Sequence, residues 1–213
     1  MAHTANNETL EFESIFRPNN VLAKQQVFTQ YTIPLTGPIG EIHEYRELVN
    51  ILAHAREDDQ VYIQLSSPGG SLDTCDYLCR RMDECEARIT VEIGMTCASA
   101  ASAIALQADD WVIYDSSTMM IHACSYSPGY GKESDIRSRV DYTERLNREW
   151  IERTYNGFLC EDETIEAIMH GKDIYLFADD LRERMPLFHE HREQCKAQRS
   201  EEIMCHWDQQ EAA

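Results

Sequence analysis

The chain has 213 residues, with 38 acidic against 19 basic side chains, a formal charge of −19 and a pI near 4.7. Hydrophobic residues make up 43% of the sequence, which is ordinary for a soluble globular protein of one domain with tails. The strong negative charge argues against a nucleic-acid partner, because phosphate binding needs clustered Lys and Arg, and against docking on a membrane of anionic lipids.

The sequence carries no pattern typical of a membrane span or a signal peptide. Its most apolar stretch, residues 95–106, is shorter than the ~20 residues that a helix needs to cross a bilayer. Glutamates at positions 8, 11 and 13 replace the basic and apolar regions of a signal peptide. We therefore expect a cytoplasmic protein whose eight cysteines are free thiols in a reducing compartment.

In chain order, predicted strands alternate with predicted helices. Residues 1–26 are polar and predict a flexible N-terminal arm. Strands are predicted at residues 27–35, 61–65, 89–93, 110–114, 119–124 and 174–176. Helices are predicted at residues 41–57, 71–88, 135–158, 164–170 and 178–185, and a turn at residue 94 leads into a small-residue helix ending at residue 106. A charged tail, residues 189–213, follows. The alternation favours an α/β fold with a largely parallel sheet, whose functional site lies at the carboxyl ends of the strands.

Four short features have the chemistry of acyl transfer. Ser99 lies where a predicted strand turns into a helix, and unpaired N–H groups at a helix start stabilise an oxyanion. The loop at residues 67–70, Ser-Pro-Gly-Gly, allows close backbone approach. His122 ends an apolar strand, and Asp173 lies in a turn. Each feature alone is also typical of a cap, a turn or a packed histidine, but together they supply a nucleophile, a base, an orienting carboxylate and an oxyanion loop.

The order S-P-G-G, T-C-A-S-A-A-S, M-M-I-H and G-K-D-x-Y-L-x-A-D-D-L resembles the proteolytic subunit of the Clp protease, and within that family the phage head-maturation proteases. The likeness runs over residues 27–187. It implies a ClpP/crotonase-like α/β spiral of ββα units, with a peptidase domain at residues 27–188. The resemblance also implies a helix that protrudes from the domain as a handle, within a segment at about residues 125–158.

The same resemblance implies the roles of individual residues in a serine endopeptidase. Ser99 matches the nucleophile, His122 the general base and Asp173 the orienting acid, and Ser102 is a rival nucleophile one helical turn further on. The backbone N–H groups of three further residues match the oxyanion hole, namely Gly69, Gly70 and Ala100. The resemblance implies no cofactor and no metal.

Partners and assembly also follow from the resemblance. It implies polypeptide substrates and a homo-oligomer of heptameric rings stacked in pairs, and the charge on each subunit predicts assembly that depends on salt. The N-terminal arm does not match the apolar loop with which relatives dock an ATPase, so an AAA+ unfoldase as partner is left open. Ile174 stands where many relatives have an arginine that couples ring contacts to the active site, so this sequence lacks that residue.

Three alternatives remain open from the sequence. A crotonase-type acyl-CoA enzyme would share the fold and an oxyanion hole, but would not need the three triad residues together. A catalytically silent ring acting as scaffold or adaptor fits the acidic surface. A metal site could use ligand types in the tail, although their spacing fits no zinc pattern; these residues are His189, His191, Cys195, Cys205 and His206.

Overall fold

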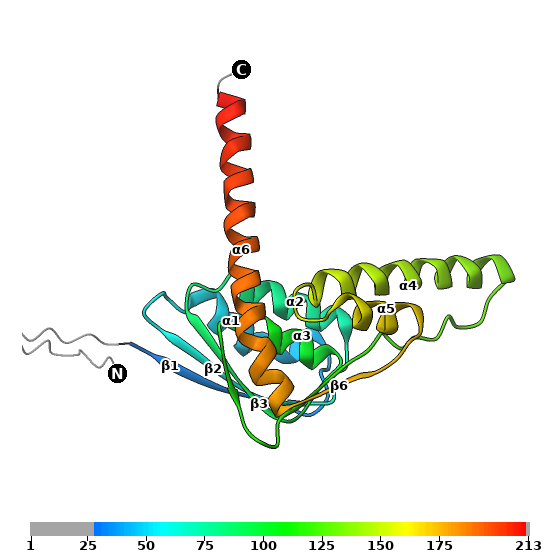
Figure 1. The fold of residues 1–213 in the computed structure, drawn as a ribbon, viewed down its shortest axis with the longest axis horizontal. Helices are drawn as coiled ribbons and strands as arrows, with labels where there is room; N and C mark the ends of the chain where they lie inside the picture. The colour runs from blue at the N-terminus through cyan, green and yellow to red at the C-terminus, as the bar shows by residue number, and fades with distance from the viewer. Residues whose placement is uncertain (1–27, 212–213) are drawn as a thin grey trace, which may run out of the picture.

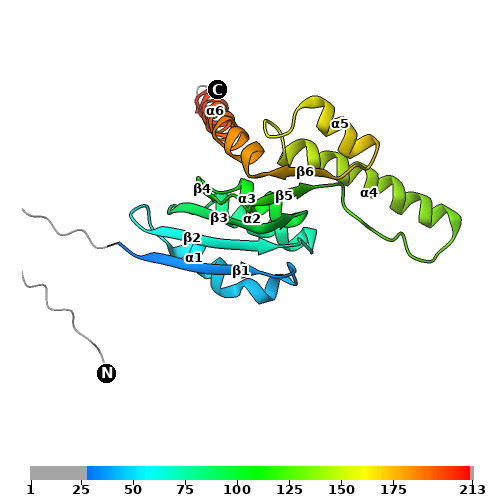
Figure 2. The same ribbon diagram turned by 60° about the horizontal axis from the view of Figure 1, so that its bottom comes forward.

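In the computed structural model, the backbone is described for residues 28–211, and side chains are described up to residue 198 and at residue 201. The predicted N-terminal arm lies outside the described residues. A six-stranded sheet forms the centre of the molecule (Figure 2). Its strands are β1 (Gln30–Thr36), β2 (Gln60–Ser67), β3 (Arg88–Ala98), β4 (Asp110–Ile113), β5 (Thr118–Ile121) and β6 (Ile174–Phe177).

The strand order is β1-β2-β3-β5-β6, and β4 also pairs with β3. All pairs are parallel except β5 with β6, so the largely parallel sheet that the sequence predicts is confirmed. Both β4 and β5 pair with β3, first β4 with residues 90–93 and then β5 with residues 97–98. Alternate residues of β2 are buried, such as Val61, Ile63 and Leu65, as expected of a strand with one face on the core.

Helices cover one face of this sheet (Figure 1). They are the short 3-10 helix η1 (Ile42–Tyr45), α1 (Arg46–His54), α2 (Leu72–Asp83) and α3 (Ala100–Leu106). Every residue of α3 is buried, because its small side chains let it pack closely on the sheet and on α2. Ser71 caps α2 by accepting a hydrogen bond from the N–H of Thr74.

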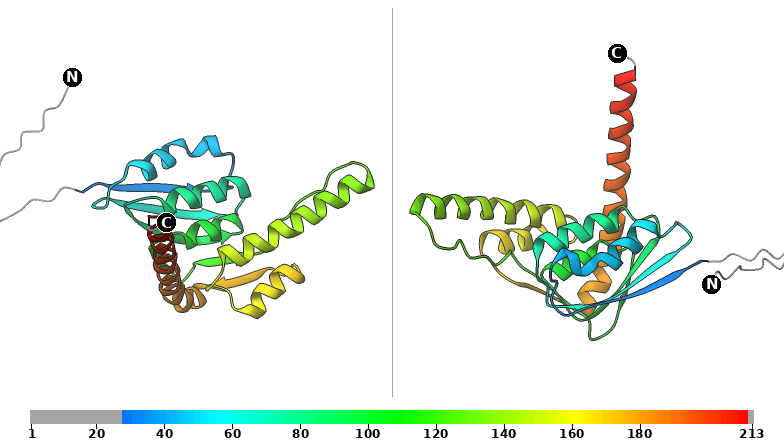
Figure 3. Two further views of the ribbon diagram at one scale, coloured as in Figure 1. Left: turned by 90° about the horizontal axis from the view of Figure 1, so that it is seen from above. Right: turned by 180° about the vertical axis from the view of Figure 1, so that it is seen from behind.

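Three further helices follow β5 in the chain: α4 (Glu133–Thr154), α5 (Glu161–Met169) and α6 (Ala178–Glu211). Figures 1 and 3 show α4 projecting from the body, with the segment after β5 running outward beside it to the start of the helix. The side chain of Asn147 on α4 bonds to both the N–H and the carbonyl of Cys124 in that segment, at 2.9 and 3.4 Å. Only Trp150 and Ile151 of α4 are buried, so most of this helix is exposed. It occupies the place of the predicted handle.

Several predicted boundaries differ from the structure; the helix predicted at residues 71–88, for example, ends at Asp83. The turn predicted at residue 94 is wrong, because β3 continues to Ala98, where Cys97 and Ala98 pair with Met119 and Met120 of β5. Tertiary pairing here overrides the weak strand preference of small residues. The helix predicted at residues 178–185 continues through Pro186 into the tail as one helix, α6, which ends at Glu211. No helix in the described part of the chain is both long enough and apolar enough to span a bilayer.

Candidate active site

The sheet brings the predicted catalytic residues to one edge. Ser99 follows β3 directly, and its N–H donates to the carbonyl of Met120 on β5 at 2.8 Å, which extends the ladder by one step. His122 follows β5, so both side chains lie at the carboxyl ends of neighbouring parallel strands. β6 runs antiparallel to β5 and pairs Ile174 with Ile121. Continuing that register by one residue places Asp173 beside His122.

Ser99 adopts a strained backbone at the turn into α3. Its φ is 55° and its ψ is −125°, and it is the only non-glycine residue with positive φ among residues 28–211. Such a conformation costs about 1–3 kcal/mol and persists only where the surrounding structure enforces it. A sharp turn from strand to helix presents the hydroxyl of a nucleophilic serine. His122 Nε2 lies 2.8 Å from Ser99 Oγ, within reach for direct proton transfer.

Asp173 is close to His122 but does not bond to it. Asp173 Oδ1 is 3.8 Å from His122 Nδ1, beyond a hydrogen bond and within the range of an ion pair. The Asp173 side chain is 43% exposed, and its second oxygen accepts a hydrogen bond from the hydroxyl of Tyr175 at 3.1 Å. That bond to an anion raises the pKa of Tyr175. The structure therefore brings all three predicted residues together, but with a looser contact at the acid.

Gly69 brings the Ser-Pro-Gly-Gly loop into contact with the turn at Ser99. A Cβ on Gly69 would lie 2.6 Å from the carbonyl oxygen of Ala98, 2.7 Å from Ser99 Cβ and 3.0 Å from the nitrogen of Ala100. Its φ of +92° also disfavours any residue with a side chain. Only glycine therefore allows the loop backbone to approach the candidate nucleophile this closely.

The candidate oxyanion donors differ in whether their N–H group already forms a hydrogen bond within the fold. Gly69 donates its N–H to the hydroxyl of buried Ser67 at 3.1 Å. Gly70 forms a bridge with Ile39, but this bridge uses the carbonyl of Gly69 and the N–H of the following residue, at 2.9 and 2.8 Å. The N–H of Gly70 itself is not part of that bridge. Gly70 is thus the better candidate donor of the two glycines, together with Ala100 at the start of α3.

The rival nucleophile Ser102 is occupied in the core. It is fully buried, its hydroxyl donates to the carbonyl of Ser99 at 2.6 Å, and its Oγ lies 2.8 Å from the hydroxyl of Tyr155. The imidazole of His122 instead bonds to Ser99. This arrangement favours Ser99 over Ser102 as the nucleophile.

Two tyrosines at the site were not predicted from the sequence. Tyr175 follows Asp173 by two residues, so the two-residue repeat of a strand could have placed both side chains on one face. Tyr155 reaches Ser102 from a position 53 residues away, at the end of α4. Nothing in the local sequence pattern indicates that contact, because it depends on how α4 docks.

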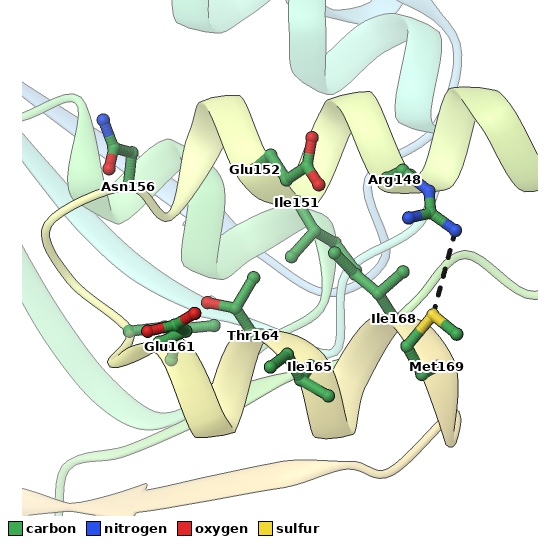
Figure 4. Close-up of a pocket in the computed structure, with 10 residues that line it drawn as sticks. Arg148, Ile151, Glu152, Asn156, Glu161, Thr164, Ile165, Ile168 and Met169 are labelled. Atoms are coloured by element: carbon green, nitrogen blue, oxygen red, sulfur yellow. Dashed lines mark hydrogen bonds between the residues drawn. The ribbon is translucent and has the colours of Figure 1, made fainter.

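A cavity of about 510 Å³ lies between α4 and α5, away from Ser99 (Figure 4). Its lining mixes apolar and polar side chains, with Ile151 and Ile168 facing each other from the two helices, and Arg148 bonds to the sulfur of Met169 at 3.8 Å. None of the predicted catalytic residues lines it. The candidate active site is therefore the sheet edge that carries Ser99 and His122, and not this cavity.

The alternative of a metal site in the tail gains no support from the described residues. His191 lies near Cys195, at 3.8 Å, while His189 packs edge-on against Trp111. Within the described residues, no three His, Cys, Asp or Glu side chains gather as metal ligands would. The side chains at positions 205 and 206 lie outside that description.

Comparison with models of protein families matches residues 19–183 to the Clp protease family. A comparison with curated proteins finds no match. The family model covers most of the chain, including the sheet, the turn at Ser99, His122 and Asp173. Proteins of this family generally form oligomeric rings. Because the family model matches most of the chain and the fold is mixed α/β, the chain belongs to the Clp protease family.

Proposed function

We propose that this protein is a serine endopeptidase that hydrolyses peptide bonds through Ser99, His122 and Asp173. The observation that carries the proposal is the 2.8 Å contact between Ser99 Oγ and His122 Nε2, at a turn whose strain has no other evident use. A silent scaffold would have no need to maintain that strained serine beside a histidine. A crotonase-type acyl-CoA enzyme would not need this serine–histidine pair.

The proposed reaction follows from this geometry. His122 takes the proton of Ser99 as the serine oxygen attacks the peptide carbonyl. The N–H groups of Gly70 and Ala100 receive the oxyanion, and each such donor is worth about 3–4 kcal/mol in the transition state. The imidazolium then protonates the leaving amine. Water, activated by His122, hydrolyses the acyl-enzyme, while the charge of Asp173 favours the imidazolium in both steps.

The proposed substrate is a polypeptide bound at the sheet edge, and the proposed assembly is a homo-oligomeric ring of the family kind, with heptameric rings stacked in pairs. The exposed length of α4 supports a role in contacts between subunits. Native mass spectrometry across protein and salt concentrations tests the assembly. We expect a ring that dissociates in part at low salt, because the charge of −19 on each subunit is then least screened. A monomer under every condition would contradict the ring.

A fluorophosphonate probe combined with cleavage of fluorogenic peptides tests the activity. We expect the wild type and Ser116→Ala, which removes an exposed serine, to be labelled and active. Ser99→Ala should lose labelling, and its kcat should fall by about 10⁵-fold or more. Labelling that persists in Ser99→Ala would show that another residue is the nucleophile. A wild type that is neither labelled nor active would favour the silent ring.

A further inference from the structure

We propose that Ser102 and Tyr155 are positioning residues that aim the N–H of Ala100 at the oxyanion. This inference rests on the proposed function, since it concerns the oxyanion hole of the same site. Neither side chain is expected to touch substrate. Both act through the peptide that joins Ser99 to Ala100.

That peptide is one rigid unit. Because a trans peptide is planar, the carbonyl of Ser99 and the N–H of Ala100 point in opposite directions. The carbonyl points into α3, where it accepts two hydrogen bonds from Ser102, one from the N–H at 2.9 Å and one from the hydroxyl at 2.6 Å. Fixing the carbonyl in this direction therefore fixes the direction of the N–H at the other side of the peptide.

Tyr155 completes the arrangement. The single hydroxyl proton of Ser102 goes to the carbonyl of Ser99, so the contact of 2.8 Å requires the hydroxyl of Tyr155 to donate to Ser102 Oγ. Tyr155 is 2% exposed, and burial raises its pKa, so the phenol stays protonated and remains a donor. In a buried chain of hydrogen bonds, each donor polarises the next group. The end of this chain is the N–H of Ala100.

The Ser102 hydroxyl is not needed to build the helix. All other residues of α3 are apolar, namely Ala100, Ala101, Ala103, Ile104, Ala105 and Leu106, and alanine forms helix better than serine. A buried hydroxyl on this helix is therefore a cost to stability unless it is satisfied, and here it donates to the carbonyl of Ser99 and accepts from Tyr155. Tyr155 is the C-cap of α4, so the arrangement also connects the end of the projecting helix to the oxyanion hole.

The test compares Ser102→Ala, Tyr155→Phe and the double variant with the wild-type protein. Ser102→Ala should lower kcat by about 10- to 100-fold with little change in KM, which is less than the loss of a complete oxyanion donor. It should also lower the melting temperature, since it leaves the hydroxyl of Tyr155 buried without its partner. Tyr155→Phe, which keeps the bond from Ser102 to Ser99, should lower kcat less than Ser102→Ala.

The double variant separates positioning from stability. Removing both hydroxyl groups leaves no unsatisfied partner, so the melting temperature should recover toward the wild type. If the pair positions the oxyanion donor, kcat should stay as low as in Ser102→Ala. Inhibition by a peptide aldehyde, whose adduct places an oxyanion in the same hole, should weaken in the double variant by the same factor as kcat/KM.

The outcomes are distinct. A double variant with wild-type kcat and wild-type aldehyde inhibition would overturn the inference while the proposed function stands. Activity that recovers together with the melting temperature would also overturn it, because the pair would then be only structural. An inactive wild type would overturn the proposed function and this inference with it.

Discussion

The two ends of the proposed triad are held in different ways. At the nucleophile, the Ser99 peptide groups bond to Met120 and Ser102, and the backbone of Gly69 packs directly against the turn. At the acid, the Asp173 side chain is 43% exposed, lies 3.8 Å from the imidazole and accepts its hydrogen bond from Tyr175, which is 64% exposed.

This difference indicates which part of the site the fold itself builds. The strained Ser99 is half-buried and is followed by the buried Ala100, so a single subunit already holds the geometry of the proposed attack step. Asp173 instead lies in the short stretch between α5 and β6, and its exposed carboxylate accepts its hydrogen bond from another exposed side chain, that of Tyr175. Substitutions at the nucleophile end should therefore lower the activity more than substitutions at the acid end.

Among variants that keep Ser99, the largest effect is expected for Gly69→Ala. Its new methyl group would overlap Ala98, Ser99 and Ala100, so both the turn and the oxyanion donors should move, and kcat/KM should fall on the order of 10³-fold. Gly37→Ala is the matched control, because its φ of +80° is similar but nothing lies within 4 Å of the added Cβ. Both variants should lose about 1–2 kcal/mol of stability from positive φ. Equal activity of the two in a peptide-cleavage assay would show that the close approach of Gly69 is unimportant.

A smaller loss is expected for Asp173→Asn. The substitution removes the charge that favours the imidazolium, but no hydrogen bond to His122 is present to be lost. We expect kcat to fall about 10²-fold, less than the ~10⁴-fold loss expected where the acid is firmly hydrogen-bonded to the histidine. Asp179→Asn removes the same charge at an exposed position on α6 and should keep full activity. An undiminished kcat in Asp173→Asn would remove Asp173 from the triad.

The stability of the packing between α5 and α6, the helices before and after Asp173 in the chain, should depend on pH. Arg184 on α6 bonds to both oxygens of Glu163 on α5 at 2.7 Å, and this contact holds the pKa of Glu163 below its usual value. Because the lowered pKa belongs to the folded state, the stabilisation is present above the ordinary glutamate pKa and is lost as the pH falls through the lowered value.

Glu163→Gln should therefore lower the free energy of unfolding by about 1–2 kcal/mol at neutral pH, and the difference should shrink in acid. Urea denaturation at several pH values measures this. Glu133→Gln, which breaks the exposed pair with Arg137 on α4, should change stability by less than about 0.5 kcal/mol. If Glu163→Gln lowers the free energy of unfolding as much in acid as at neutral pH, the lost stability comes from packing and not from charge.

The same comparison shows what sequence can predict. The strands, the helices and the shared edge of Ser99 and His122 follow from periodicity and from the rule that parallel strands end together. The roles of these residues came from a family resemblance, and they stay predictions. The extension of β3 to Ala98 and the reach of Tyr155 to Ser102 depend on contacts between distant segments, which no local pattern encodes.

The smallest effect is expected for Tyr175→Phe. This variant removes the hydrogen bond to Asp173 at 3.1 Å, in a setting exposed enough that the bond is worth under about 1 kcal/mol, so kcat should fall two- to fivefold by the corresponding Boltzmann factor. Tyr142→Phe, on the exposed face of α4, is the control and should be unchanged. If Tyr175→Phe instead matched Asp173→Asn, the hydroxyl would be the main restraint on the carboxylate. The acid end would then be as firmly organised as the nucleophile end, and the contrast between them would not hold.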